Sequence, residues 1–167
     1  MAVIAVGAGV VMLVALVLII GFGLYEGDRP EEQAARRYLT AIYDGDARAS
    51  YGMTTPAYRT IVLPPDHQLL IDTLHAAAGD DVTTRTIGAE RTPGTDPLES
   101  LVGYKGTTAI GDVEGVVTLF RIEDEWLVAA VSYRFTEAPP GATDELDAVT
   151  RALNQQLSDR ADPSPST

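Results

Sequence analysis

The chain has 167 residues and a net charge of −12, because 24 acidic side chains outnumber 12 basic ones. This length provides one domain of ordinary size in addition to a membrane segment. A surface this acidic repels the phosphates of nucleic acids, so we expect no nucleic-acid partner. Cysteine is absent, which excludes disulfides, thiol catalysis and cysteine-based zinc sites.

An unbroken apolar run from Ala2 to Leu24 contains no charged residue. As a helix it would be about 34 Å long, enough to cross a hydrocarbon core of about 30 Å. Only Met1 precedes the run, and the run is longer than the apolar core of a signal peptide, which has about 7–15 residues. We therefore predict that residues 1–25 form an uncleaved, single-pass transmembrane anchor in a lipid bilayer.

Two small residues of this run, Ala5 and Gly9, lie about one helical turn apart. A pair of small residues at this spacing lets a second transmembrane helix approach closely. We predict that Ala5 and Gly9 form a packing site for the helices of other membrane protein subunits.

Helical patterns follow the anchor. Residues 28–32 are typical of a helix start, with a proline in the first turn and acidic residues that complement the positive end of the helix dipole. Apolar residues then recur at helical spacing as far as Tyr43. We predict that residues 44–46 end this helix and cap a short second one. Residues 54–56 are predicted to be a break between helices, and residues 64–79 are predicted to form a third helix.

The next part of the chain has the patterns of β-strands. Residues 82–90 alternate in character and are rich in threonine, and residues 98–110 predict a weaker strand interrupted by glycines. The clearest signal is a hairpin with β-branched and aromatic arms, residues 116–122 and 126–135. A linker rich in proline and glycine then leads to a last amphipathic helix, residues 144–159.

Three helices followed by about four antiparallel strands predict an α+β fold, with the helices packed on one face of a curved antiparallel sheet. We divide the chain into an anchor, residues 1–25; an α+β domain, residues 26–138; a linker and C-terminal helix, residues 139–160; and a disordered-type tail, residues 161–167.

The pattern A-x-x-x-Y-L-x-A-x-x-x-G-D-x-x-x-S-Y over residues 34–51 resembles the opening of NTF2-like (SnoaL-like, cystatin-like) domains. In these domains a first helix ends in Gly-Asp and a short second helix follows. The acidic turn at residues 123–125, which precedes Trp126 and an apolar strand, is similar to the final strands of that family. The likeness covers residues 31–135 and implies a cone whose pocket binds apolar ligands or performs acid–base chemistry.

The membrane side of the domain follows from two opposing observations. Arg29, Arg36 and Arg37 lie close to the anchor among acidic residues, and by the positive-inside rule they favour a cytoplasmic domain. Membrane-anchored bacterial proteins that resemble the NTF2-like family mostly hold this domain outside the cytoplasm. We expect a bacterial inner-membrane protein with a periplasmic domain, and the cytoplasmic side stays open as the alternative.

No residue of the chain is predicted to be catalytic. The resemblance implies that an enzyme of this kind would use tyrosine and carboxylate side chains in the cone, but no acidic residue occupies an apolar, inward-facing strand position in the predicted elements. We expect Tyr38 and Tyr43 to be core residues with their hydroxyl groups at the rim.

We predict no metal site and no cofactor. The two histidines, His67 and His75, are eight residues apart on a predicted helix, which separates them by about 12 Å along its axis, so they cannot bind one ion. We expect each of them at the surface or at its boundary. No phosphate-binding loop of the Gly-x-x-x-x-Gly-Lys type occurs.

These observations favour a non-catalytic, single-pass accessory or assembly subunit of a larger membrane complex, respiratory or photosynthetic, which acts through its transmembrane helix and its acidic domain. The candidate partner contacts are Arg36, Arg37, and the apolar stripe of the last helix, Leu146, Val149, Leu153 and Leu157. That stripe docks either on the domain or on a partner.

Two alternatives remain open. A membrane-anchored binding module for a small apolar ligand requires an apolar cavity that no side chain plugs. An enzyme of the isomerase or dehydratase type requires an aspartate or histidine with a shifted pKa inside that cavity. The accessory subunit predicts a filled cone and an exposed apolar patch near the anchor or the last helix.

Overall fold

The computed structural model describes residues 29–161, apart from the side chains of residues 153 and 156–161. Its elements in chain order are α2 (Pro30–Tyr43), α3 (Ala47–Gly52), α4 (Pro56–Ile61), α5 (Pro64–Ala78), β1 (Thr83–Thr92), β2 (Leu98–Thr108), β3 (Gly111–Ile122), β4 (Glu125–Thr136) and α6 (Asp144–Ala161). The expected α+β class is confirmed. The predicted anchor, with Ala5 and Gly9, and the tail beyond residue 161 lie outside the described residues.

None of the described helices combines the length and the apolar character needed to cross a bilayer.

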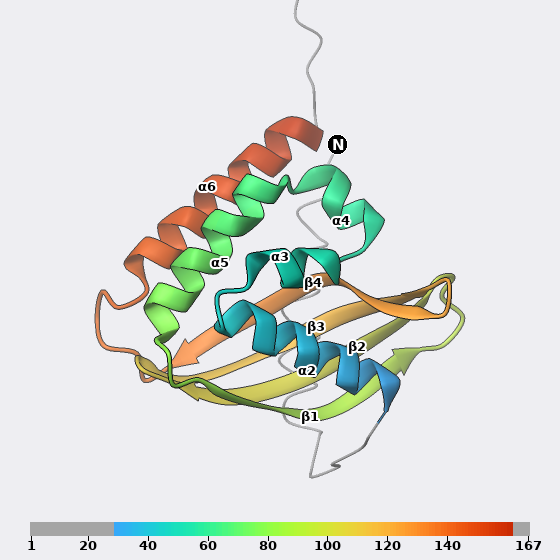
Figure 1. Ribbon diagram of the computed structural model, residues 1–167, viewed down its shortest axis with the longest axis horizontal. Coiled ribbons are helices and arrows are strands. Elements are labelled where there is room, and N and C mark those ends of the chain that lie inside the picture. The colour runs from blue at the N-terminus through green and yellow to red at the C-terminus, as the bar shows by residue number, and fades with distance from the viewer. Residues whose placement is uncertain (1–28, 162–167) are drawn as a thin grey trace, which may run out of the picture.

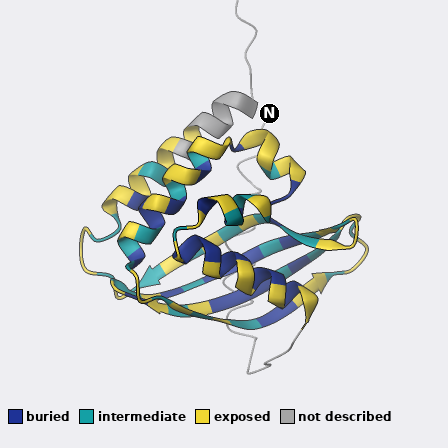
Figure 2. Ribbon diagram, in the orientation of Figure 1, coloured by how far each residue is buried: buried dark blue, intermediate teal, exposed yellow. Residues whose placement is uncertain are grey.

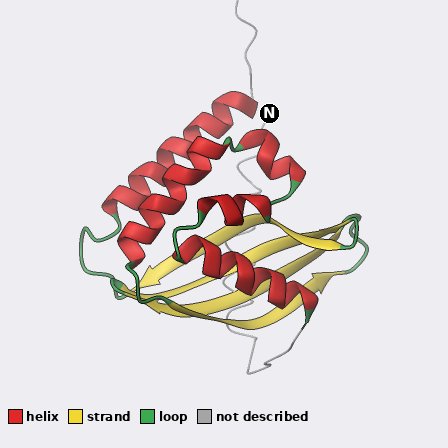
Figure 3. Ribbon diagram, in the orientation of Figure 1, coloured by secondary structure: helices red, strands yellow, loops and turns green. Residues whose placement is uncertain are grey.

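The four strands form one antiparallel sheet in the order β1-β2-β3-β4, so each strand pairs with its neighbour in the sequence. The sheet is curved, and all of the described helices lie on one of its faces (Figures 1 and 3). Glu123 and Asp124 join β3 to β4 with φ values of 49° and 67°. Positive φ at both central residues is the geometry of a tight two-residue hairpin, so the turn is one residue shorter than the sequence predicts.

The core lies between the sheet and α2, which crosses it (Figure 1). Leu39 and Ile42 on α2 are fully buried against inward-facing strand residues such as Val102, Val117 and Tyr104. These side chains follow the helical spacing of α2 and the alternation of the strands. Figure 2 shows the buried residues gathered where the helices face the sheet, while exposed residues cover the outer sides of the helices.

The beginning of α2 is held to the sheet by an ion pair. Arg91 on β1 donates two hydrogen bonds, of 2.8 and 2.9 Å, to the buried carboxylate of Glu31. The same guanidinium lies 5.7 Å from the centre of the Trp126 ring on β4, within range of a cation–π contact. One arginine therefore connects the first turn of α2 with two strands.

A short helix that the sequence does not predict, α4, begins at the end of the predicted break at residues 54–56. Thr55 caps this helix, because its hydroxyl oxygen accepts a hydrogen bond of 3.1 Å from the backbone N–H of Tyr58, and Pro56 occupies the first turn. Just before α4, Thr54 forms a parallel bridge with Val128 at the start of edge strand β4. This bridge fixes the entry to α4 and protects part of the sheet edge.

The last helix docks on the domain rather than extending from it. α6 packs beside α5 (Figure 1), and Leu146 is 1% exposed in the core. The Thr150 and Tyr133 hydroxyl oxygens lie 3.3 Å apart and form a hydrogen bond between α6 and β4. These contacts make α6 one wall of the interior.

Candidate functional site: an apolar cavity along strand β4

A cavity of about 670 Å³ lies between four helices and the end of the sheet. Its described lining consists mainly of apolar side chains from α2, α4, α5, β3 and β4, and α6 contributes Thr150 and Asn154. Three tyrosines also line it: Tyr38, Tyr58 and Tyr133. The consecutive residues Ala129, Ala130 and Val131 all line it. The pairing of β3 with β4 shifts register here and leaves Ala129 without a partner, so a bulge interrupts the alternation of β4 where the strand borders the cavity.

The cavity has a buried floor and an open mouth. Ile42, Ile71 and Leu74 line it and are at most 2% exposed, so they form the floor. At the other extreme, Ile61 at the end of α4 also lines it but is 45% exposed. The cavity is therefore deep, apolar at its base and accessible near α4.

The hydroxyl groups of the lining differ in their partners. The Tyr58 hydroxyl lies 2.9 Å from Nδ1 of His67, and the Tyr133 hydroxyl bonds to Thr150. The Tyr38 hydroxyl makes no hydrogen bond with any described residue, although Tyr38 is only 2% exposed. Tyr38 therefore offers an uncommitted donor and acceptor to the cavity.

Tyr58 is positioned by a buried histidine. The Ser50 hydroxyl donates to the carbonyl oxygen of Ala47 at 3.1 Å, so the Nε2–H of His67 donates to Ser50 Oγ at 2.8 Å. Nδ1 of His67 is then unprotonated and accepts the proton of the Tyr58 hydroxyl. This chain of hydrogen bonds joins α3, α5 and α4 behind the cavity wall.

The expectation that His67 lies at the surface is wrong, because His67 is 1% exposed. Its burial lowers its pKa to about 4, so the ring is neutral near pH 7. His75 does lie at the boundary, where Nδ1–H donates to the carbonyl oxygen of Tyr43 at 2.6 Å. Within residues 29–161 no group of three or more potential ligands could hold a metal ion.

The tyrosines are more deeply placed than the sequence predicts. The Tyr43 hydroxyl is not at a rim but lies 3.4 Å from the hydroxyl of buried Tyr104. Burial raises the pKa of Tyr58 to about 12 and raises the pKa of Tyr38 far above its ordinary value. The phenols of Tyr38 and Tyr58 therefore stay protonated at physiological pH.

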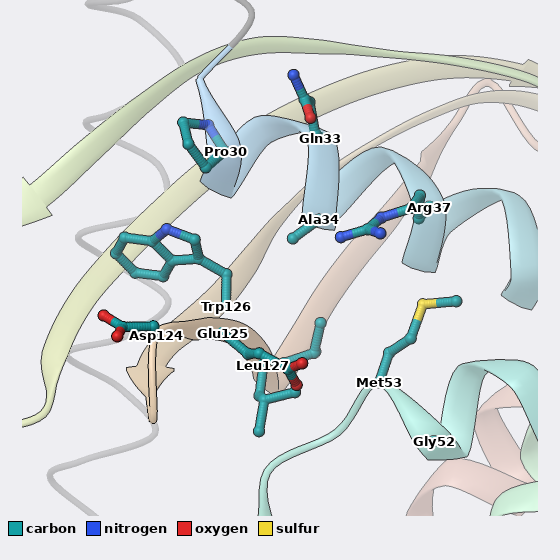
Figure 4. A pocket seen from close by; sticks show the side chains of 11 residues that line it. Pro30, Gln33, Ala34, Arg37, Gly52, Met53, Asp124, Glu125, Trp126 and Leu127 are labelled. Carbon is teal, nitrogen blue, oxygen red and sulfur yellow. The ribbon is translucent and has the colours of Figure 1, made fainter.

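A second, smaller hollow of about 350 Å³ lies between α2 and the start of β4. Figure 4 shows the Arg37 side chain extending from α2 over this hollow, with Trp126 and Met53 among its walls. Asp124 and Glu125 from the hairpin turn also line it. Its walls thus combine opposite charges with an indole ring.

The predicted partner contacts are distributed over several places. Arg36 and Arg37 are exposed on α2, and only Arg37 belongs to the hollow of Figure 4. Leu146 is buried inside the domain, and Val149 is half-buried. The side chains of residues 153 and 157 lie outside the described part, so Leu153 and Leu157 stay predictions, as do Ala5 and Gly9.

No protein-family model matches this sequence, and none of the curated proteins matches it. Among solved structures, the chain is similar to a variant of Rv3472, a protein of unknown function from Mycobacterium tuberculosis, with 16% sequence identity. The match covers 75% of this chain and 85% of the other chain, with a TM-score of 0.47.

Proposed function

We propose that this protein is a membrane-anchored binding module that holds a small apolar ligand in the cavity along β4. The observation that supports this function is the cavity itself, whose volume of about 670 Å³ lies within the range of small-molecule sites. Protein interiors are normally close-packed, and unfilled apolar space costs stability. A deep cavity that the described residues leave open favours a role for that space.

The arrangement of the cavity is compatible with the cone of an NTF2-like domain, which we propose as the fold family. Four antiparallel strands curve around helices that lie on one face of the sheet, and the cavity opens between the helices and the sheet. We place this domain outside the cytoplasm, on a bacterial inner membrane, behind the anchor predicted for residues 1–25.

We propose binding without a chemical step. An isomerase or dehydratase would need a group in the cavity that exchanges protons near neutral pH. The phenols of Tyr38 and Tyr58 keep their protons there, because burial raises the pKa of both. Among the described lining residues, one has a carboxylate side chain: Asp66, in the first turn of α5.

Native mass spectrometry tests this function. The full-length protein would be extracted from its own membranes in mild detergent and released from the detergent micelle inside the spectrometer. We expect the protein to carry a co-purified small molecule of defined mass. An Ala129→Phe variant fills the cavity and should lose that molecule, whereas Ala76→Phe, on the exposed face of α5, should keep it. A wild-type protein that carries no small molecule after extraction, and gains none on incubation with a lipid extract, would contradict the proposal.

A second candidate function is the accessory subunit of a membrane complex. Ile61, Leu63 and Leu69 are 45–50% exposed where α4 meets α5, and large exposed hydrophobic side chains in one region favour a protein contact. Co-purification from native membranes in mild detergent, followed by mass spectrometry, tests this role. A stoichiometric set of membrane subunits supports it, and a monomer that binds a small molecule favours the first function.

A further inference from the structure

We propose that the cavity selects an uncharged amphiphile, an apolar molecule with a single hydroxyl or carbonyl group, and that the Tyr38 hydroxyl recognises that group. Tyr38 is then the specificity-determining residue of the site. This inference rests on the proposed binding function and assigns the chemical class of the ligand.

The depth of Tyr38 is the first argument. Its side chain is 2% exposed, and its neighbours on the cavity floor are Ile42, Ile71 and Leu74. The Tyr38 hydroxyl is not among the described buried atoms that lack a partner, so it faces the open space of the cavity, where an oxygen of the ligand can take the place of water as its hydrogen-bond partner. The apolar floor around Tyr38 accepts hydrocarbon, so one polar group on the ligand is sufficient.

The other hydroxyls of the lining are already engaged. Tyr58 bonds to His67, Tyr133 bonds to Thr150, and Thr55 Oγ1 accepts the backbone N–H of Tyr58. The first two bonds each join two separate elements, and the third caps α4. Tyr38 differs because its hydroxyl supports no described structural bond, which leaves it for a ligand.

Charge in the lining argues for a neutral ligand. The carboxylate of Asp66 belongs to the described lining and repels a ligand carboxylate. Moving a carboxylate from water into this apolar floor is expensive without a positive partner. Tyr38 itself stays neutral, since burial raises its pKa far above its ordinary value. An alcohol or a ketone meets neither obstacle.

The test uses three photoreactive probes that share one long alkyl chain with a diazirine and end in a hydroxyl, a methyl or a carboxylate group. The full chain is reconstituted in nanodiscs and irradiated, and labelled peptides are identified by mass spectrometry. Labelling as a function of probe concentration gives the apparent affinity at the cavity peptides alone. We expect the hydroxyl probe to bind roughly three- to tenfold more tightly than the methyl probe, and the carboxylate probe to bind more weakly than the hydroxyl probe.

Two tyrosine variants separate recognition from folding. In Tyr38→Phe the hydroxyl and methyl probes should bind equally, while the affinity of the methyl probe stays at its wild-type value. Tyr43→Phe removes a hydroxyl from the same helix, one that bonds to Tyr104 and does not line the cavity, so it should keep the wild-type preference.

The experiment distinguishes a failure of the role proposed for Tyr38 from a failure of the proposed binding function. Equal binding of the hydroxyl and methyl probes to the wild-type protein overturns the role of Tyr38 but leaves the binding function intact. The same holds if the preference persists in Tyr38→Phe or if the carboxylate probe binds most tightly. Absence of labelling at the cavity by all three probes overturns the binding function itself.

Discussion

Two buried ionisable residues, Glu31 and His67, differ in charge state because their partners differ. Burial opposes the charged form of both groups. Burial alone would raise the pKa of Glu31, but the hydrogen bonds and charge of Arg91, together with Arg29, hold it below its ordinary value, so Glu31 stays ionised. His67 has only neutral partners, Ser50 and Tyr58, and therefore stays neutral.

Replacing Arg91 with alanine should lower the free energy of unfolding by roughly 2–4 kcal/mol, because it leaves the buried Glu31 carboxylate without its counter-charge. The matched control is Arg85→Ala, an exposed arginine on the same strand, which should change stability by less than about 0.5 kcal/mol. Chemical denaturation of both variants measures the difference. Equal stabilities of the two variants would show that the Glu31 pair is dispensable.

The buried, neutral His67 predicts that the free energy of unfolding falls in mild acid. Its pKa is about 4 in the folded protein and 6.5 in an unfolded chain, so below pH 6.5 the unfolded state binds a proton that the folded state does not. The free energy of unfolding should therefore fall between pH 6.5 and pH 4, by about 3 kcal/mol in total, with no further loss from this group below pH 4.

Denaturation at several pH values measures this loss, with His67→Gln as the control that cannot titrate. The Glu31 contribution lies in a lower window, since its stabilising charge is lost only as the pH falls through its lowered pKa. If wild type and His67→Gln lost stability in parallel between pH 6.5 and pH 4, the neutral buried histidine would not be the source.

At the scale of elements, local sequence signals located most helices and strands. The first domain helix was predicted from its proline and its acidic first turn, and the short α3 from its capping Asp46, whose side chain accepts the N–H of Ala49 at 2.9 Å. The hairpin of β3 and β4 followed from its β-branched arms. Helix α4 was missed because Thr55-Pro56 is consistent with both a break and a capped helix start, and only the bridge from Thr54 to Val128 decides between them.

The packing of β3 against its neighbours depends on a glycine. A Cβ atom at Gly115 would collide with the carbonyl oxygen of Ser132 and approach Tyr104 Cε1 to 2.8 Å. Gly115→Ala should therefore destabilise the protein by about 1–3 kcal/mol, because backbone on the adjacent strand must move.

Gly52→Ala is the control for this substitution, since it adds the same methyl group at the end of α3 with nothing within 4 Å. It should be neutral or slightly stabilising. Thermal denaturation of the two variants provides the comparison, and a Gly115→Ala protein as stable as Gly52→Ala would show that the sheet accommodates the extra carbon without strain.

At the scale of the whole molecule, the cavity along β4 joins residues from six elements that are distant in sequence, between Tyr38 on α2 and Asn154 on α6. Docking of α6 on α5 completes its wall. The domain is acidic, and the large exposed hydrophobic side chains of its described residues concentrate where α4 meets α5, beside the mouth at Ile61. Ligand entry and partner contact would thus occur in the same region.

The predicted anchor gives a prediction at this scale that is independent of the cavity. Gly9→Leu adds bulk at the small-residue pair and should reduce the recovery of partner subunits in a pull-down from native membranes. Val11→Leu, on another side of the same predicted helix, should leave recovery unchanged. Undiminished recovery with Gly9→Leu would argue against packing through Ala5 and Gly9.

The sequence by itself determined the α+β class, four antiparallel strands and the positions of most helices, because periodicity, caps and turn residues act over a few neighbouring residues. The apolar run of residues 2–24 likewise predicts an anchor without reference to the domain. Tertiary structure alone decided that Glu31 and His67 are buried, since their partners Arg91, Ser50 and Tyr58 come from other elements.

Only the tertiary structure also decided that the interior is hollow. Tyr38, Ile42, Ile71 and Leu74 have the spacing of ordinary core residues, and that spacing is the same whether they meet a neighbour or a cavity. Empty volume arises from how helices and sheet are separated in space, and a pattern within one element contains no information about that separation.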